Sequence, residues 1–342
     1  KFVVISLAVL MVFSFLFGTV SSLFAILLLR FMVGFGQAGY TNGSPKIISD
    51  SFEADQCARI QSFVVATAGI GGILASTVGE SIIHTNWHHA YWFLGFGYLA
   101  ALLLAVIFLK EHKKEEPLEQ TKTIEKKEKI GFFDAWKNRN TLLLAGAVLF
   151  SNLVGVAMMF WLPNVFHVNF NIENPAMLSS VMVGFYVIMT IAMASSGIIL
   201  TKYFKNKELT FIFWASVLTA VCLVIFITAP LYQLAIAALY VGDFAMMLAF
   251  SGLLAVPYQL IPRNIIGSAF AVLNIGAFVG GIVSPQLVST FARSGSYTIS
   301  FIVLAVCMVI SGGLALLVKK PGQVKETEKN QQLRKQMNHA KA

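Results

Sequence analysis

Charged residues are scarce in this sequence. Asp, Glu, Lys and Arg together make up 12% of its 342 residues, whereas ordinary soluble domains hold roughly 25%. Hydrophobic residues make up 57%. The chain therefore lacks the polar surface of a soluble domain, and its composition predicts a protein that crosses a membrane several times.

Cysteine is also scarce, with only Cys57, Cys222 and Cys307 in the chain. Cys57 lies in a predicted loop, and the other two lie inside different apolar segments without the spacing of metal ligands. The sequence therefore predicts neither a disulfide framework nor a cysteine metal site, and we interpret all three as packing residues.

Motifs for nucleotide, metal or covalent chemistry are absent or out of context. The stretch from Gly34 to Gly39 satisfies the dinucleotide glycine pattern, but it lies inside an apolar run rather than between a strand and a helix. His84, His88 and His89 have a spacing that could hold a metal, but no cysteine or second acidic cluster joins them. We expect no cofactor, no metal, no enzymatic activity and no ATP-driven process.

Ten apolar segments are present instead, each about as long as a membrane-spanning helix. Their length and the absence of alternating ten-residue segments predict an all-α fold rather than a barrel. The segments cover approximately residues 2–17, 22–41, 60–83, 90–109, 141–163, 177–200, 209–229, 231–256, 264–290 and 297–318.

Basic residues give the chain a net charge of +9, and their distribution predicts its topology. When alternate connections are placed on one side, that side holds every Lys and Arg except Arg30 and Arg293. The positive-inside rule then places both chain ends in the cytoplasm. The positive charge thus indicates membrane orientation rather than a nucleic-acid partner, and we expect a multi-pass protein of the cell membrane, of the bacterial cytoplasmic type.

The segments fall into two unequal groups. We predict an N-terminal bundle of four spans over residues 1–109, a charged cytoplasmic linker over 110–140, a six-helix bundle over 141–318 and a polar cytoplasmic tail over 319–342. Val33-Gly34 recurs as Val241-Gly242, and Gly71-Gly72-Ile73 recurs as Gly280-Gly281-Ile282, at nearly equal offsets. The two halves therefore resemble a duplication, as in many transporters.

Two stretches resemble the major facilitator superfamily, whose transporters have two bundles of six helices. Arg30 to Gln37 is similar to the arginine-phenylalanine-x-x-glycine stretch of the family's fourth helix. Gly197 to Lys207 is similar to the basic loop motif between its eighth and ninth helices, although Thr201 stands where an acidic residue is usual. The resemblance runs from the family's third helix to its twelfth, so it implies ten of twelve helices, with two missing before Lys1.

Within that superfamily the chain looks most like the anion:cation symporter group. The resemblance rests on Trp161 to Pro163 and on Ile261 to Pro285. It implies a secondary transporter for a small organic anion, such as a sugar acid, usually with proton symport. Many members have a glutamate where this chain has Gln37, so that proton carrier is missing. A drug/proton antiporter stays an alternative, although Ala68 to Ala75 lacks the glycine-proline pair of those proteins.

Arg30 is the only cation well inside a predicted span, where a charge costs at least about 2.5 kcal/mol and usually faces a cavity or a partner. Helical spacing places Gly34, Gln37 and Thr41 on the same face as Arg30. A guanidinium binds a carboxylate through two parallel hydrogen bonds, so we predict that Arg30 and Gln37 bind the anion. The alternative is a permanent ion pair between Arg30 and Asp243.

Asp243 is the only acid deep in a span, and we predict that it carries the coupling proton. Its alternative is a fixed ion pair or a hydrogen bond to backbone. Glu80 and His84 are four residues apart and could form a further proton relay, or simply a polar pair at the membrane surface.

Three further polar residues, Asn152, Tyr186 and Asn274, are predicted to line the substrate cavity. The alternative for each is a hydrogen bond between helices. Small residues also repeat every fourth position, at Gly71, Ala75 and Gly79 and at Gly276, Gly280 and Ser284, which predicts helix-packing seams.

The sequence thus predicts a proton-coupled organic-anion symporter that acts as a monomer by alternating access. Its partners are a small organic anion, the proton and the lipid bilayer. A non-transporting membrane receptor or scaffold with the same fold is the alternative from a different class.

Overall fold

A computed structural model describes residues 2–79, 82, 86–108, 132–172, 174–262, 265–292 and 296–319. Glu80 and His84 lie outside these residues. Every described element is a helix or a connection between helices, so the all-α prediction is confirmed.

In the described part of the chain, each of the ten predicted segments overlaps a long helix. Nine of these helices are long and apolar enough to cross a membrane, and α1, with 16 residues, is slightly shorter. The helices are α1 (Phe2–Phe17), α2 (Leu23–Ser51), α3 (Ala54–Leu74), α5 (Trp87–Phe108), α7 (Arg139–Phe170), α8 (Pro175–Lys202), α9 (Glu208–Thr228), α10 (Tyr232–Ala255), α12 (Ile266–Phe291) and α13 (Thr298–Leu316).

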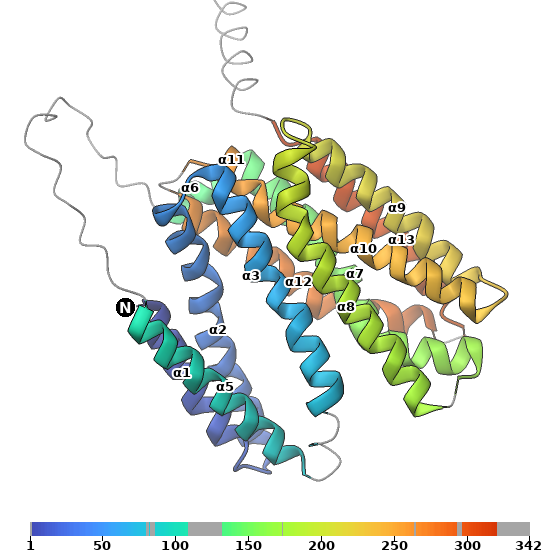
Figure 1. Cartoon of the computed structure of the whole chain (residues 1–342), viewed down its shortest axis with the longest axis horizontal. Coiled ribbons are helices and arrows are strands. Elements are labelled where there is room, and N and C mark those ends of the chain that lie inside the picture. The colour runs from blue at the N-terminus through green and yellow to red at the C-terminus, as the bar shows by residue number, and fades with distance from the viewer. Residues whose placement is uncertain are drawn as a thin grey trace, which may run out of the picture.

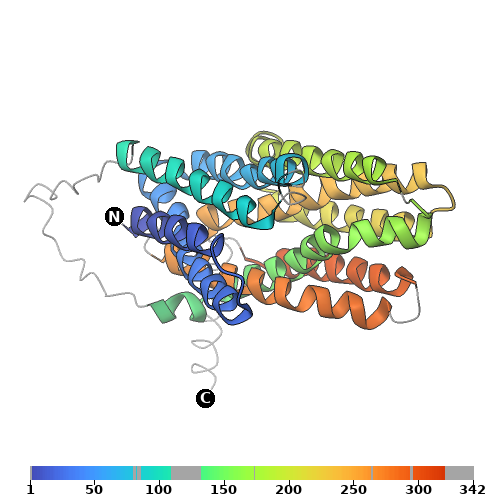
Figure 2. The ribbon, with the colours of Figure 1, turned by 90° about the horizontal axis from the view of Figure 1, so that it is seen from below.

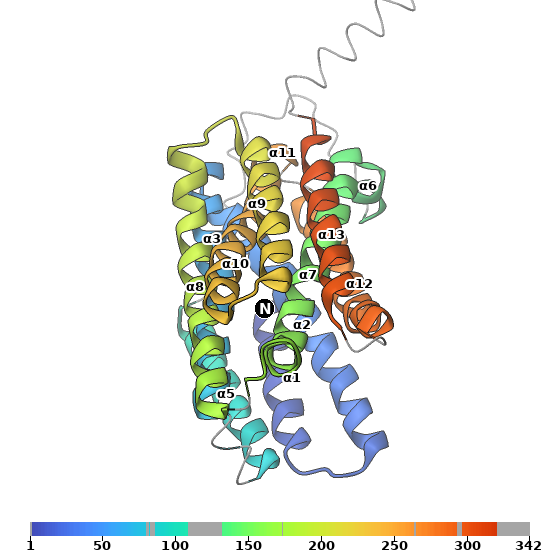
Figure 3. The same cartoon turned by 90° about the vertical axis from the view of Figure 1, so that its right-hand side faces the viewer.

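Three short elements complete the described chain. A π-helical turn, η1 (Ala75–Gly79), continues α3, while α6 (Phe132–Lys137) precedes α7 and α11 (Pro257–Leu260) follows α10. We call the end of the molecule that holds the α2–α3, α8–α9 and α10–α12 connections the linker end. Figures 1 and 3 show α6 and α11 at this end.

Helix ends follow local capping chemistry. α7 begins two residues before its apolar segment, because the Asn138 side chain accepts hydrogen bonds from the backbone N–H groups of Asn140 and Thr141. It ends at Phe170 and is capped by Asn171, whose φ of 52° places it in the left-handed region that Asn tolerates. α2 continues ten residues past its predicted end. The polar stretch after Thr41 is also helical, and Pro45 lies inside it.

Two groups of helices are joined by contacts of α3 with α8 and α10 and of α2 with α12. Figures 1 and 2 show α1, α2 and α5 together on one side, the helices from α7 onward on the other, and α3 alongside α8. α3 packs mainly against α8 and α10, although it belongs to the first four spans in sequence. The division of the chain into bundles over 1–109 and 141–318 stays a prediction.

The seam between α7 and α12 depends on small residues. A Cβ at Gly276 or Gly280 would collide with the carbonyl oxygens of Ala145 and Leu149 on α7, respectively. Ser284 Oγ extends the seam by donating to the Leu153 carbonyl at 2.7 Å. The predicted packing role of this stripe is therefore confirmed, because two helix backbones approach closely only over small side chains.

The predicted seam on α3 is wrong at Gly71. A Cβ at Gly71 would meet nothing within 4 Å, whereas one at Gly69 or Gly72 would collide with Thr190 or Tyr186 of α8. The face of α3 that contacts α8 is thus displaced from the one that four-residue spacing selects. Spacing alone cannot show which of several neighbouring glycines faces the partner helix.

Gly280→Ala is expected to destabilise the protein by about 1–3 kcal/mol, because the added methyl group has no room against the α7 backbone. Gly71→Ala is the matched control, since its methyl group enters open space and alanine favours the helix by about 1 kcal/mol. Thermal unfolding of both purified variants measures the difference. Equal melting temperatures would contradict the assigned seam.

Candidate functional site

Arg30 lies on an exposed face of α2 and is held by aromatic side chains. Its Nη2 donates a hydrogen bond to Tyr91 Oη of α5 at 2.5 Å. Its guanidinium carbon also lies 5.0 Å from the ring centre of Phe17 and 5.4 Å from that of Tyr91. These contacts orient the cation without neutralising it.

The surroundings of Arg30 leave room for a ligand. A Cβ at Gly34, one turn along α2, would meet nothing within 4 Å, and Gln37 is exposed. A guanidinium has five N–H donors, and the hydrogen bond to Tyr91 uses one of them. The remaining donors can bind a carboxylate in the bidentate geometry that guanidinium favours.

Asp243 lies in the middle of α10 and is buried. Its side chain is 3% exposed, and neither carboxylate oxygen has a hydrogen-bond partner. Burying an ionised carboxylate without a partner is strongly unfavourable, so the group must be neutralised or given a partner. α10 packs against α3 and α8 in this region.

Arg30 and Asp243 do not pair. Arg30 contacts α1 and α5, whereas Asp243 lies on α10 with both oxygens unpartnered. The structure thus excludes the permanent ion pair that was the alternative for both residues.

Tyr186 on α8 is a predicted site residue that lies near Asp243. It is 8% exposed, its ring lies against Gly72 of α3, and its hydroxyl is within electrostatic range of the Asp243 carboxylate. The structure therefore brings Tyr186 and Asp243 together at the junction of α3, α8 and α10. Arg30 and Gln37 lie apart from them on α2.

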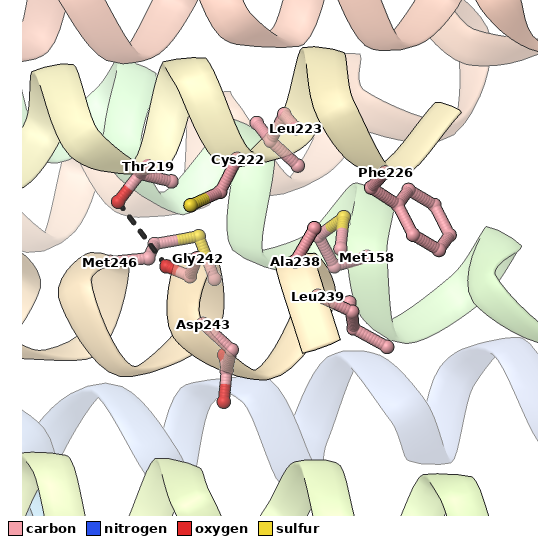
Figure 4. Close-up of a pocket in the computed structure, with 10 residues that line it drawn as sticks. All are labelled: Met158, Thr219, Cys222, Leu223, Phe226, Ala238, Leu239, Gly242, Asp243 and Met246. Carbon is pink, nitrogen blue, oxygen red and sulfur yellow. Dashed lines mark hydrogen bonds between the residues drawn. The ribbon is translucent and has the colours of Figure 1, made fainter. Parts of the chain in front are cut away.

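A small cavity lies on the other side of α10. Asp243 is one of its lining residues, although Figure 4 shows its side chain pointing away from the others, and α7, α9 and α10 supply the mostly apolar walls. The space inside is about 10 Å³, which is room for about one water molecule and far too little for an organic anion. This cavity is not the substrate site.

Asn152 and Asn274 both bond to neighbouring helices. Asn152 Nδ2 donates to the Ala277 carbonyl of α12 at 2.6 Å. Asn274 Nδ2 donates to Asn42 Oδ1 of α2 at 2.7 Å. These bonds match the alternative given for both residues, and their substrate contacts stay predictions.

Asn152→Ala tests which role Asn152 has. Loss of an interhelical hydrogen bond costs about 0.6 kcal/mol on average, and at most about 1.7 kcal/mol. We expect a slightly lower melting temperature and an unchanged KM for uptake. A KM raised tenfold or more would instead assign Asn152 to the substrate cavity.

Some residues near the site gave no signal in the sequence. Tyr91 and Phe17 lie in apolar segments, where one more aromatic residue does not stand out, although both contact Arg30.

His88 bonds to Ser21 and Asn86 at the α5 start. Among the described residues, no three His, Cys, Asp or Glu side chains gather closely enough to hold a metal ion.

The sequence profile of the Major Facilitator Superfamily matches residues 1–285. The chain belongs to the major facilitator superfamily. Solved structures of superfamily transporters have the same fold. The human organic anion transporter MFSD10 aligns with 92% of this chain and 76% of its own, with a TM-score of 0.75 and 14% sequence identity. The fucose:proton symporter FucP of Escherichia coli aligns with 93% of this chain and 82% of its own, with a TM-score of 0.71 and 12% identity.

Curated relatives resemble only part of the chain. Protein spinster homolog 1 of Xenopus tropicalis is 36% identical over 104 residues, which are 28% of this chain and 20% of that protein. Its mouse counterpart is 32% identical over 106 residues, with the same coverage. The chain thus spans about a fifth of the length of these relatives. Membership of the superfamily is confirmed, whereas the anion:cation symporter group stays a prediction.

Proposed function

We propose that this major facilitator protein is a secondary active transporter that moves a small organic anion across the membrane together with a proton. One observation carries the proposal. The two charges deepest in the spans, Arg30 and Asp243, are not paired with each other. Because an isolated charge in a membrane is costly, each needs a partner that the two side chains do not supply to each other.

The anion is the partner that fits Arg30. Tyr91 and Phe17 fix the guanidinium from one side, and Gly34 and Gln37 leave the α2 surface beside it open. A guanidinium that is already oriented loses little conformational entropy when a carboxylate binds. Gln37 adds an amide that can hydrogen-bond a second polar group of the anion.

The proton is the partner that fits Asp243. Protonation neutralises the carboxyl group and removes the cost of burying a charge without hydrogen bonds. Tyr186 can donate a hydrogen bond to the carboxylate when the proton leaves. The exchange of this proton between the two sides would couple transport to the pH gradient.

Orientation follows from the basic residues. We propose that both chain ends and the linker end of this multi-pass membrane protein face the cytoplasm, because the positive-inside distribution of its basic residues favours that orientation. In this arrangement the two groups of helices on either side of α3 rock against each other during transport. One copy of the chain is sufficient for this movement. The two structural neighbours, an organic anion transporter and a fucose:proton symporter, are consistent with the proposed class.

Uptake by proteoliposomes tests the proposal. Radiolabelled sugar acids, dicarboxylates, neutral sugars and lipophilic cations are offered with and without an inward proton gradient, and empty liposomes are the control. We expect one class of anion to accumulate, and a protonophore to abolish the accumulation. Uptake of lipophilic cations alone would favour the drug-antiporter alternative, and no uptake of any compound would favour a non-transporting protein.

A further inference from the structure

Sulfur atoms gather around the small cavity beside α10. Three of the side chains that line it contain sulfur, namely Met158 of α7, Cys222 of α9 and Met246 of α10. Their exposed fractions are 2%, 6% and 2%, so all three lie inside the protein. Figure 4 shows the Cys222 sulfur extending from α9 toward the Met246 sulfur on α10, with the Met158 sulfur on α7. We call these three residues the sulfur site.

Gly242 lets the Cys222 side chain approach α10. A Cβ at Gly242 would lie 2.8 Å from Cys222 Cβ and 3.9 Å from its Sγ, so a larger residue would push the two helices apart. Thr219, one turn earlier on α9, donates its hydroxyl to the Gly242 carbonyl at 3.3 Å and to the Ala215 carbonyl at 2.9 Å. The Cys222 thiol, in contrast, is free and forms no hydrogen bond with the described residues.

The cavity suits a soft metal ion better than it suits water or a hard metal ion. The space of about 10 Å³ holds one small particle. A buried water needs two to four polar partners, and the Thr219 hydroxyl proton is already shared between two carbonyls. Mg²⁺ and Ca²⁺ need several oxygen ligands, whereas the Asp243 carboxylate points away from the other lining residues (Figure 4). Thiolate and thioether sulfur instead select Cu(I) and similar soft ions.

Charge balance favours a monovalent ion. When such an ion binds, the S–H bond of Cys222 breaks, a sulfur–metal bond forms and the proton leaves to solvent, with no change of oxidation state. The thiolate cancels the single positive charge of the ion, and the two thioethers are neutral. The loaded site therefore stays uncharged and avoids the cost of an unpaired charge inside a membrane protein. A divalent ion would leave one positive charge uncompensated.

We infer that the sulfur site binds one soft monovalent metal ion, Cu(I) or Ag(I), through the Cys222 thiolate and the thioethers of Met158 and Met246. Methionine side chains are unbranched and flexible, so both thioether sulfurs can turn toward the same ion. The bound ion would join α7, α9 and α10. The inference goes beyond the proposed function, because metal binding requires neither the organic anion nor its transport. A packing role for Cys222, as the sequence predicts, is the alternative.

Metal titration of the purified protein tests the sulfur site. Cys57 and Cys307 are first changed to Ala, so that Cys222 is the only thiol left in the chain. This parent protein is titrated with Ag(I), or with Cu(I) under reducing conditions, in competition with the chelator bicinchoninate. Metal that stays with the protein after gel filtration is counted by mass spectrometry. We expect one ion per chain and a higher melting temperature, because the ion binds only the folded arrangement of three helices.

Substitutions of the three ligands separate the sulfur site from other metal binding. Cys222→Ala is expected to weaken binding by about 100-fold or more, since loss of even an outer-shell partner costs about 10–100-fold in metal affinity. Met158→Leu and Met246→Leu keep the volume but remove the sulfur, and each is expected to weaken binding by about tenfold. Met247→Leu is the matched control, because Met247 is also buried on α10 but does not line the cavity.

X-ray absorption of the Cu(I)-loaded parent protein counts the ligands, and we expect three sulfur neighbours. A single sulfur neighbour, or unchanged affinity in both Met158→Leu and Met246→Leu, would show a reactive thiol only and would overturn the site. Unchanged binding by Cys222→Ala would place the ion elsewhere. No binding by the parent protein would leave Cys222 in its packing role, so either of these results would also refute the inference.

Discussion

Arg30→Ala is expected to abolish saturable uptake of the anion. Removing one member of a charged, hydrogen-bonded pair costs about 2–5 kcal/mol, which corresponds to a loss of roughly 30-fold or more in affinity. The aromatic residues that hold Arg30 bring no cation that could replace it. Initial uptake rates over a range of anion concentrations measure the effect.

Two further variants separate a specific role of Arg30 from a loss of charge or of folding. Arg30→Lys keeps the charge but cannot donate two parallel hydrogen bonds, so we expect an intermediate KM. Arg139→Ala removes an exposed arginine at the start of α7 and is expected to leave uptake unchanged. Wild-type uptake by Arg30→Ala would refute the assignment of Arg30 to the anion.

Asp243→Asn is expected to uncouple transport from the pH gradient. The amide has the shape of the protonated carboxyl group but cannot release a proton, so the gradient no longer drives accumulation. Symport of one proton with one monoanion would concentrate the anion about tenfold for each pH unit, because a pH unit is worth about 1.4 kcal/mol. We expect that ratio to fall to about one, while exchange of labelled for unlabelled anion continues.

The accumulation ratio at steady state, measured with an inward gradient of one pH unit, shows the outcome. Asp50→Asn is the matched control, because Asp50 is exposed and pairs with Lys46 at 2.7 Å. An unchanged ratio in Asp243→Asn, alongside an unchanged ratio in Asp50→Asn, would exclude Asp243 as the proton carrier.

The helices could be predicted from the sequence because the membrane constrains each of them separately. A spanning segment must be long, apolar and internally hydrogen-bonded, and these properties are local. Within the residues that the structure describes, each of the ten predicted segments therefore coincides with a helix. The recurring residue pairs and the Arg30 stretch then sufficed to indicate the superfamily, which the profile match confirms.

Contacts between helices could not be predicted to the same extent. The apolar segment that begins at about residue 90 gives no sign that the Tyr91 hydroxyl meets Arg30, and four-residue spacing selected Gly71 where Gly69 and Gly72 face α8. The hydrogen bond between Ser62 and Ser251 gave no signal for the same reason, since the two residues are 189 positions apart. Which residues meet depends on the rotation of each helix about its axis, and an apolar sequence specifies that rotation only weakly.

Polar residues inside spans were recognisable, but their roles were not. Asn152 and Asn274 fit a substrate cavity and an interhelical bond equally well in the sequence, and the structure places both in interhelical bonds. The ion pair between Arg30 and Asp243 was equally plausible, because both are isolated charges in apolar segments. Only their positions on separate groups of helices exclude it.

Ligand-dependent thermal stabilisation tests most directly whether Arg30 holds an organic anion. The purified protein and Arg30→Ala are unfolded by heat in the presence of sugar acids, dicarboxylates, neutral sugars or lipophilic cations. A ligand at 100 times its Kd stabilises the folded state by roughly 2.7 kcal/mol. We predict that one class of anion raises the melting temperature of the wild type and leaves that of Arg30→Ala unchanged. Equal stabilisation of both proteins, or stabilisation by lipophilic cations alone, would contradict an anion site at Arg30.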